Sequence, residues 1–169
     1  QTVRLKTYIE GFDRALEGGI PQGHIVLMAG TPGTMKSSLT YYALYNQAKE
    51  SGTTCVYVTL EQSRNSLLRQ MEKMGMRTEE VRQSLHILDL GIIRKNLKSS
   101  ACSESWMQVF KGYLNSLKND LGFSVLAIDS LGVLETLSSM SNRRTDLFYL
   151  FEWLRDLNAT SFLISEVSP

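Results

Sequence analysis

A glycine-rich segment at residues 30–37 ends in a lysine and a serine, and these residue types bind phosphate. Its sequence is Gly-Thr-Pro-Gly-Thr-Met-Lys-Ser, and it follows an apolar run at residues 24–29. Between a strand and a helix, such a segment turns successive backbone N–H groups and the positive end of the helix dipole toward one anion. Gly30, Lys36 and Ser37 fit the phosphate-loop pattern G-x-x-x-x-G-K-S/T, in which the lysine reaches the outer phosphates and the hydroxyl binds Mg²⁺. Met35 occupies the position of the second glycine.

Carboxylates follow two further apolar runs. Asp129 ends the run Val-Leu-Ala-Ile-Asp, and Glu61 follows the run at residues 54–60. Mg²⁺ prefers hard oxygen ligands and keeps several waters, so one carboxylate, Ser37 and the phosphates are enough to hold it. A second acid one strand away could orient or deprotonate the water that attacks the terminal phosphoryl group. These residues predict a magnesium–nucleotide site, in which Asp129 binds the metal and Glu61 acts on the attacking water.

Each of these features also has a plainer interpretation. Residues 30–37 could be an ordinary strand-to-helix turn, Asp129 could cap the segment that follows it, and Glu61 could be a solvated loop acid. Ser165 and Glu166, which follow a fifth apolar run, could sense the terminal phosphate or could be loop residues. The presence of all of them after strands of one alternating series favours the nucleotide site.

The elements that must position these residues alternate along the chain. Strands are expected at residues 24–29, 54–60, 85–90, 124–128 and 161–165, because these runs are short, apolar and rich in Val and Ile. Helices are expected at residues 36–50, 63–74 and 105–117, and from about residue 142 onward. This alternation predicts an α/β fold with three layers, in which helices cover both faces of a mainly parallel sheet. Active sites in such sheets lie at the carboxyl ends of the strands.

Composition is that of an ordinary globular domain. The 169 residues are 43% hydrophobic and 21% charged, enough for one core and one domain. The net charge of +1 gives no electrostatic support for DNA binding, which remains only an open possibility. No apolar run approaches the ~20 residues of a membrane span, and no leader is visible, so we expect a cytoplasmic protein without a membrane partner. Cys55 and Cys102 indicate neither a disulfide framework nor a zinc site.

The chain resembles the RecA-fold P-loop ATPases of the KaiC-like group, which includes archaeal RadA-related and circadian-clock-related proteins. The resemblance covers nearly the whole chain. It rests on Gly-Phe-Asp at residues 11–13, Leu-Glu-Gly-Gly-Ile-Pro at residues 16–21, Val-Thr-Leu-Glu-Gln-Ser at residues 58–63, the Walker B strand ending in Asp129-Ser130, and Leu-Ile-Ser-Glu at residues 163–166.

This resemblance implies ATP and Mg²⁺ as cofactors. Lys36 would bind the outer phosphates and assist catalysis, Ser37 and Asp129 would serve the metal, and Glu61 would be the catalytic base. The resemblance also implies a homo-oligomer, a hexameric ring or a filament. The strand order across the sheet would be the strands that begin at residues 85, 54, 124, 161 and 24. The residues expected to contact the nucleotide are Gly30, Thr31, Pro32, Gly33, Thr34, Met35, Lys36, Ser37 and Ser38.

Three departures from the family pattern bear on function. Met35 replaces a glycine, and Gln62 stands where the family often has a second glutamate. We also expect the C-terminal strands of a RecA-like domain to be missing, since the sequence ends at residue 169. The sequence therefore predicts Mg-dependent ATP binding with slow hydrolysis. The alternatives are an interaction module that binds ATP without turning it over and a recombination-type DNA-binding ATPase.

The aromatic residues of the last expected helix, Phe148, Tyr149, Phe151 and Trp153, have helical spacing. We expect them to belong to the core and not to form a platform on which bases stack. Arg143 and Arg144 are expected to be solvated charges.

Overall fold

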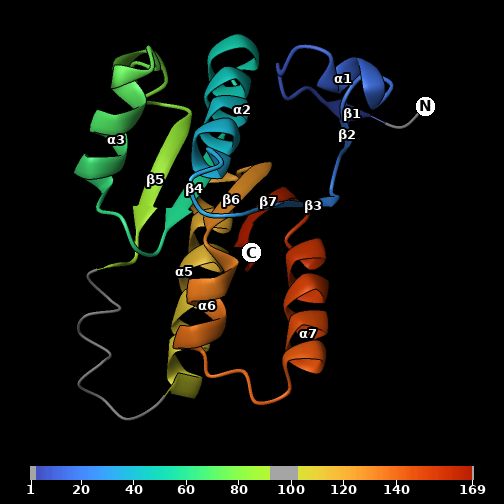
Figure 1. The fold of residues 1–169 in the computed structure, drawn as a ribbon, viewed down its shortest axis with the longest axis vertical. Helices are drawn as coiled ribbons and strands as arrows, with labels where there is room; N and C mark the ends of the chain where they lie inside the picture. The colour runs from blue at the N-terminus through green and yellow to red at the C-terminus, as the bar shows by residue number, and fades with distance from the viewer. Residues whose placement is uncertain (1–2, 92–102, 169) are drawn as a thin grey trace.

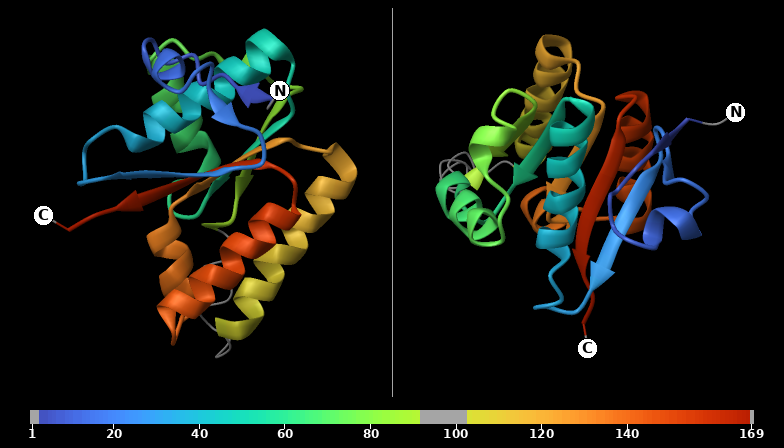
Figure 2. Two further views of the ribbon diagram at one scale, coloured as in Figure 1. Left: turned by 90° about the vertical axis from the view of Figure 1, so that its right-hand side faces the viewer. Right: turned by 90° about the horizontal axis from the view of Figure 1, so that it is seen from above.

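A computed structural model describes residues 3–91 and 103–168, and Cys102 lies outside this part of the chain. A five-stranded sheet forms the middle layer. Helices α2 and α3 cover one face and helices α5, α6 and α7 cover the other, as Figures 1 and 2 show. The expected three-layer α/β/α fold is therefore confirmed.

The strands are β3 (Ile25–Gly30), β4 (Cys55–Thr59), β5 (Leu85–Asp89), β6 (Val125–Asp129) and β7 (Thr160–Glu166). The covering helices are α2 (Lys36–Ser51), α3 (Arg64–Lys73), α5 (Ser103–Leu121), α6 (Leu131–Leu137) and α7 (Arg143–Asp156).

All neighbouring strands of this sheet are parallel, in the order β3-β7-β6-β4-β5. This is the order implied by the family resemblance, so that prediction is confirmed. Thr59 of β4 pairs with Asp129 of β6, which in turn pairs with Ile164 of β7. This register aligns the carboxyl ends of the central strands, where the predicted site residues lie.

Side chains of the central strands alternate between two cores, which explains why the apolar runs are uninterrupted. Cys55 and Tyr57 of β4 pack toward α2 and α3, whereas Val56 and Val58 pack toward α5, α6 and α7. All four are completely buried. Alternation with a period of two places successive strand residues on opposite faces, and a sheet covered on both sides therefore requires an apolar residue at nearly every position.

Helix α7 differs from expectation on its outer face. Phe148 and Tyr149 are 59% and 58% exposed, so the prediction that they belong to the core is wrong. Their rings contact each other edge to face, with centroids 5.8 Å apart. Phe151 and Trp153 do pack partly against the second core. Helical spacing identified a stripe of aromatic residues, but α7 turns only part of that stripe toward the sheet.

Several short elements were not expected from the sequence. They are β1 (Arg4–Leu5), α1 (Phe12–Ala15), β2 (Ile20–Pro21), the 3₁₀ helix η1 (Thr78–Glu80) and α6. Each is too short to show a periodic apolar pattern. Among the described residues, no helix is both long enough and apolar enough to cross a membrane.

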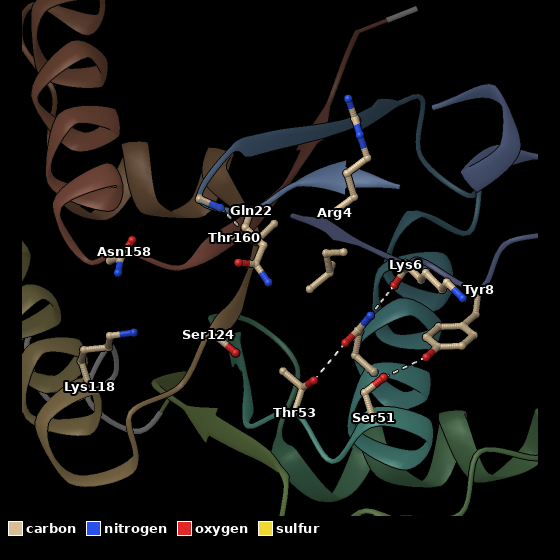
Figure 3. A pocket seen from close by; sticks show the side chains of 13 residues that line it. Arg4, Lys6, Tyr8, Gln22, Ser51, Thr53, Lys118, Ser124, Asn158 and Thr160 are labelled. Carbon is tan, nitrogen blue, oxygen red and sulfur yellow. Dashed lines mark hydrogen bonds between the residues drawn. The ribbon is translucent and has the colours of Figure 1, made fainter. Parts of the chain in front are cut away.

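Polar contacts hold the N-terminal segment together and fasten it to α2. The Asp13 carboxylate accepts hydrogen bonds from the backbone N–H groups of Thr7 and Tyr8 and from the Thr7 hydroxyl. The Gln47 amide of α2 donates to the carbonyl of Lys6 at 2.7 Å. Figure 3 shows this contact at one side of a polar hollow of about 750 Å³.

A single glycine allows the N-terminal strands to pair. Strands β1 and β2 are antiparallel, with Leu5 opposite Ile20. Gly19 has a φ of +131°, and a Cβ atom there would lie 2.1 Å from the carbonyl oxygen of Leu5. A side chain at this position would therefore push the two strands apart.

We predict that Gly19→Ala destabilises the protein by roughly 2 kcal/mol or more, because it adds a backbone clash to an unfavourable φ. Gly23→Ala is the matched control, since Gly23 also has a positive φ, +82°, but its added Cβ would meet nothing within 4 Å. The control should cost only about 1 kcal/mol. Urea unfolding of both variants measures the difference, and equal losses would show that the contact with Leu5 does not matter.

Candidate functional site

The predicted phosphate-binding loop connects β3 to α2 at the carboxyl edge of the sheet. β3 ends at Gly30 and α2 begins at Lys36, so five residues form the turn. A Cβ atom on Gly30 would lie 2.7 Å from the Thr34 hydroxyl, which donates to the carbonyl of Thr31 at 2.8 Å. A side chain at Gly30 would therefore displace the Thr34 hydroxyl from this contact. The first N–H groups of α2 have no partner within the helix, and they lie at the turn with the positive end of the helix dipole.

Met35, the departure from the pattern, adopts the conformation that favours glycine. Its φ and ψ are 62° and 28°, in the left-handed region, and it immediately precedes the first residue of α2. Its side chain is 58% exposed. The backbone of the loop therefore follows the path that the missing glycine would allow, and the side chain extends into solvent.

Lys36 folds back over this loop. Its ammonium nitrogen donates to the carbonyl oxygens of Gly30 at 3.0 Å and Thr31 at 2.9 Å. The hydroxyl of Thr34 lies 3.4 Å away. A lysine ammonium is a point charge with three donors on a flexible stem. Here that charge is held beside the turn.

Ser37 and Asp129 meet at the site although they are 92 positions apart in the sequence. The Ser37 hydroxyl donates to the Oδ2 atom of Asp129 at 2.7 Å. Both side chains offer hard oxygen atoms of the kind that Mg²⁺ prefers. No group of three His, Cys, Asp or Glu side chains that could hold a metal is found in the part of the chain that the structure describes. A site of one carboxylate and one hydroxyl fits Mg²⁺ that is bound together with phosphates.

Tyr57 is a member of this cluster that the sequence analysis missed. Its phenol donates to the same Oδ2 atom of Asp129 at 2.7 Å. Burial, together with the nearby negative charge of Asp129, raises the pKa of Tyr57 well above its usual value. The phenol therefore stays protonated and acts as a donor. Alternation along β4 places Tyr57 and Thr59 on one face, but only the register, in which Thr59 pairs with Asp129, brings the phenol to the carboxylate.

Glu61 lies at the same edge of the sheet, two residues beyond the end of β4. It is exposed, and β4 is the direct neighbour of β6, which carries Asp129. Gln62 has a different environment. Its amide donates to the Ser66 hydroxyl at 2.9 Å and to Gln70 Oε1 at 3.0 Å, both on α3. The Gln62 side chain is thus occupied by α3, whereas the Glu61 carboxylate is exposed at the sheet edge. The catalytic role of Glu61 stays a prediction.

The sequence analysis placed Ser165 and Glu166 after the fifth strand, but they are the last two residues of β7. They pair with Ala29 and Gly30, next to the start of the loop. The backbone N–H of Val167 donates to the Gly30 carbonyl at 3.1 Å. This position beside the loop is compatible with either of the two roles considered for them.

Two hollows flank the sheet in different places. A slot of about 500 Å³ adjoins the loop, and Gly30, Thr34 and Lys36 contribute to its lining together with the apolar Leu39. The polar hollow of Figure 3 lies at the opposite end of the sheet, where residues such as Thr160 begin their strands. None of the predicted site residues lines that second hollow.

We predict that Met35→Gly stabilises the free protein. An L-residue in the left-handed region destabilises the fold by roughly 1–2 kcal/mol, and glycine removes this strain. Glycine also loses more backbone entropy on folding, which offsets about 0.5–1 kcal/mol of the gain. The melting temperature should therefore rise by about 2 °C. Met35→Ala is the control, because it keeps the Cβ atom and the strain. An equal rise in both variants would mean that the exposed side chain, not the backbone, limits stability.

Comparisons with known proteins agree with this geometry. Residues 5–169 match the family described as "ATPase: KaiC". A UPF0273 protein from Aeropyrum pernix is 33% identical over 98% of this chain and 68% of its own length. Another from Sulfurisphaera tokodaii is 29% identical over 99% of this chain, which spans 62% of that relative. The circadian clock oscillator protein KaiC of Prochlorococcus marinus is 27% identical over 98% of this chain and 34% of its own length.

The crystal structure of a KaiC-like protein from the hyperthermophilic archaeon Pyrococcus horikoshii superimposes with a TM-score of 0.79 at 27% identity. The match covers 99% of this chain and 72% of that protein. Fold, loop and family match therefore agree, and the chain belongs to the KaiC family of ATPases as a P-loop domain of the RecA type.

Proposed function

We propose that this chain binds Mg·ATP at residues 30–38 and hydrolyses it slowly. The observation that carries the proposal is the 2.7 Å hydrogen bond between Ser37 and Asp129. This hydrogen bond joins the end of the loop to the end of β6. A magnesium–phosphate complex needs two oxygen-bearing side chains of this kind, a hydroxyl and a carboxylate. Membership of an ATPase family supports the same conclusion.

The roles follow from the positions of the residues. The loop N–H groups and the Lys36 ammonium would bind the phosphates, since the N–H groups carry partial positive charges and the ammonium a full one. Ser37 and Asp129 would hold Mg²⁺, which supplies charge neutralisation on the phosphates. Glu61 would accept the proton of the attacking water. The protein would contribute positioning and electrostatics, because phosphoryl transfer asks for little covalent chemistry from side chains.

A thermal-unfolding experiment with Mg·ATP tests binding. A ligand at about 100 times its dissociation constant adds roughly 2.7 kcal/mol to stability. We expect the melting temperature to rise by about 5–10 °C. Lys36→Ala should abolish most of this rise by removing a charged contact to phosphate.

Lys49→Ala is the matched control for that variant. Lys49 is on the same helix, in its last turn, where its ammonium pairs with Glu80 at 3.3 Å. Its removal makes the same change in net charge but should leave the ATP-induced rise intact. If the parent protein showed no rise at millimolar ATP, the loop would be a scaffold without nucleotide affinity.

Hydrolysis is tested separately, because binding without turnover is the alternative function. We predict that Glu61→Gln lowers the rate of ATP hydrolysis about 10²- to 10⁴-fold, the usual contribution of a general base. The ATP-induced stabilisation should persist in this variant. Glu72→Gln removes another exposed carboxylate, on α3, and should leave the rate unchanged. Equal rates in the parent and Glu61→Gln would remove Glu61 from the mechanism.

A further inference from the structure

We propose that Tyr57 is a positioning residue, whose phenol orients the Asp129 carboxylate for the magnesium ion. The inference rests on the proposed binding of Mg·ATP and concerns a residue outside the phosphate loop. Tyr57 lies in the middle of β4 and reaches the site from beneath α2. Its hydroxyl and that of Ser37 both donate to Oδ2 of Asp129, each at 2.7 Å.

Two donors on one oxygen determine how the carboxylate can be used. Each carboxylate oxygen has about two lone-pair sites. Tyr57 and Ser37 fill those of Oδ2, and none of the described residues donates to Oδ1. Oδ1 is therefore the oxygen left for the ion or for one of its waters. With only one donor, the carboxylate could rotate about its terminal bond, because such torsions have broad minima.

The surroundings of Tyr57 hold its ring in one place. The side chain is completely buried, and the ring meets Tyr41 of α2 edge to face, with centroids 5.6 Å apart. Its partner in register on β6 is Ala127, a small residue. This leaves space for the phenol to extend along the sheet toward Asp129, two residues further along the same face. Diagonal neighbours of this kind are within reach of long aromatic side chains.

Without Tyr57, Ser37 would have to bind the metal and also hold the Asp129 carboxylate in place. When the Ser37 oxygen turns a lone pair toward a metal, its own hydrogen bond to Asp129 must adjust. The hydrogen bond from Tyr57 does not depend on the ion, since the phenol comes from the buried strand. Partners that fix the orientation of a metal ligand commonly change metal affinity about 10- to 100-fold when they are removed.

The test is Tyr57→Phe, which keeps the ring and removes only the hydroxyl. ATP affinity is measured by calorimetric titration in Mg²⁺ and again in EDTA, for the parent and the variant. We expect the gain in affinity that Mg²⁺ provides to fall about tenfold in Tyr57→Phe. Affinity in EDTA should stay the same, because the Tyr57 phenol donates to Asp129, which is proposed to hold the metal and not the phosphates.

Tyr45→Phe is the matched control. Tyr45 belongs to the same core, and its phenol also donates to a carboxylate, Glu80, away from the loop. Its loss should alter stability without altering the Mg²⁺ dependence. Should either variant melt early, the parent and both variants are titrated at one lower temperature, so that their Mg²⁺ gains can still be compared.

The outcomes separate the two proposals. A parent protein that does not bind ATP in Mg²⁺ overturns the proposed function and this inference with it. A parent that binds, with an unchanged Mg²⁺ gain in Tyr57→Phe, overturns only the inference and leaves Tyr57 as a packing residue. Equal losses in Tyr57→Phe and Tyr45→Phe would also overturn it, because they would reflect a general loosening of the core.

Discussion

The hydrogen bond between Ser37 and Asp129 is the contact on which the site depends, because it brings together two oxygen-bearing side chains that are 92 positions apart in the sequence. Ser37 is in the first turn of α2, and Asp129 is the last residue of β6. Their meeting requires β6 to lie in the middle of the sheet, with one strand, β7, between it and β3. The crossover order β3-β7-β6 provides this arrangement, and the parallel register brings the strand ends to one edge. The chemistry of the site is thus a consequence of sheet topology.

Burial of β4 and β6 makes that edge rigid. Both strands are covered on two faces, and nearly every residue in them is inaccessible to solvent. A polar group at the end of such a strand stands on a close-packed support, whereas a group on a long loop would not. Tyr57 extends the same principle into the core. Its phenol is a buried polar group whose hydrogen-bonding need is met by the Asp129 carboxylate, so stability and the geometry of the candidate site share one contact.

Much of the fold could be predicted from the sequence because the central strands are buried on both faces and stand out as apolar runs. The phosphate loop was recognisable from the spacing of Gly30, Lys36 and Ser37, and the partner acid from its place at the end of an apolar run. Tyr57 was not, since an aromatic residue inside a strand is usually core, and its hydrogen bond depends on register with β6. Phe148 and Tyr149 were misplaced for a related reason. Helical spacing defines a stripe, but only the packing of α7 decides which part of the stripe is covered.

Met35 shows how a motif can depart from its pattern and keep its geometry. Phosphate loops bind through backbone N–H groups, and methionine retains the N–H that glycine would supply. What glycine contributes is access to positive φ, and the structure holds Met35 at 62° without it. The strain is borne by a loop whose two ends are fixed, by the pairing of β3 with β7 on one side and by α2 on the other. A side chain at this position therefore bears first on stability, while the backbone N–H groups, Lys36 and Ser37 keep their places around the turn. The spacing of donors and charge, more than the second glycine, defines the loop in this chain.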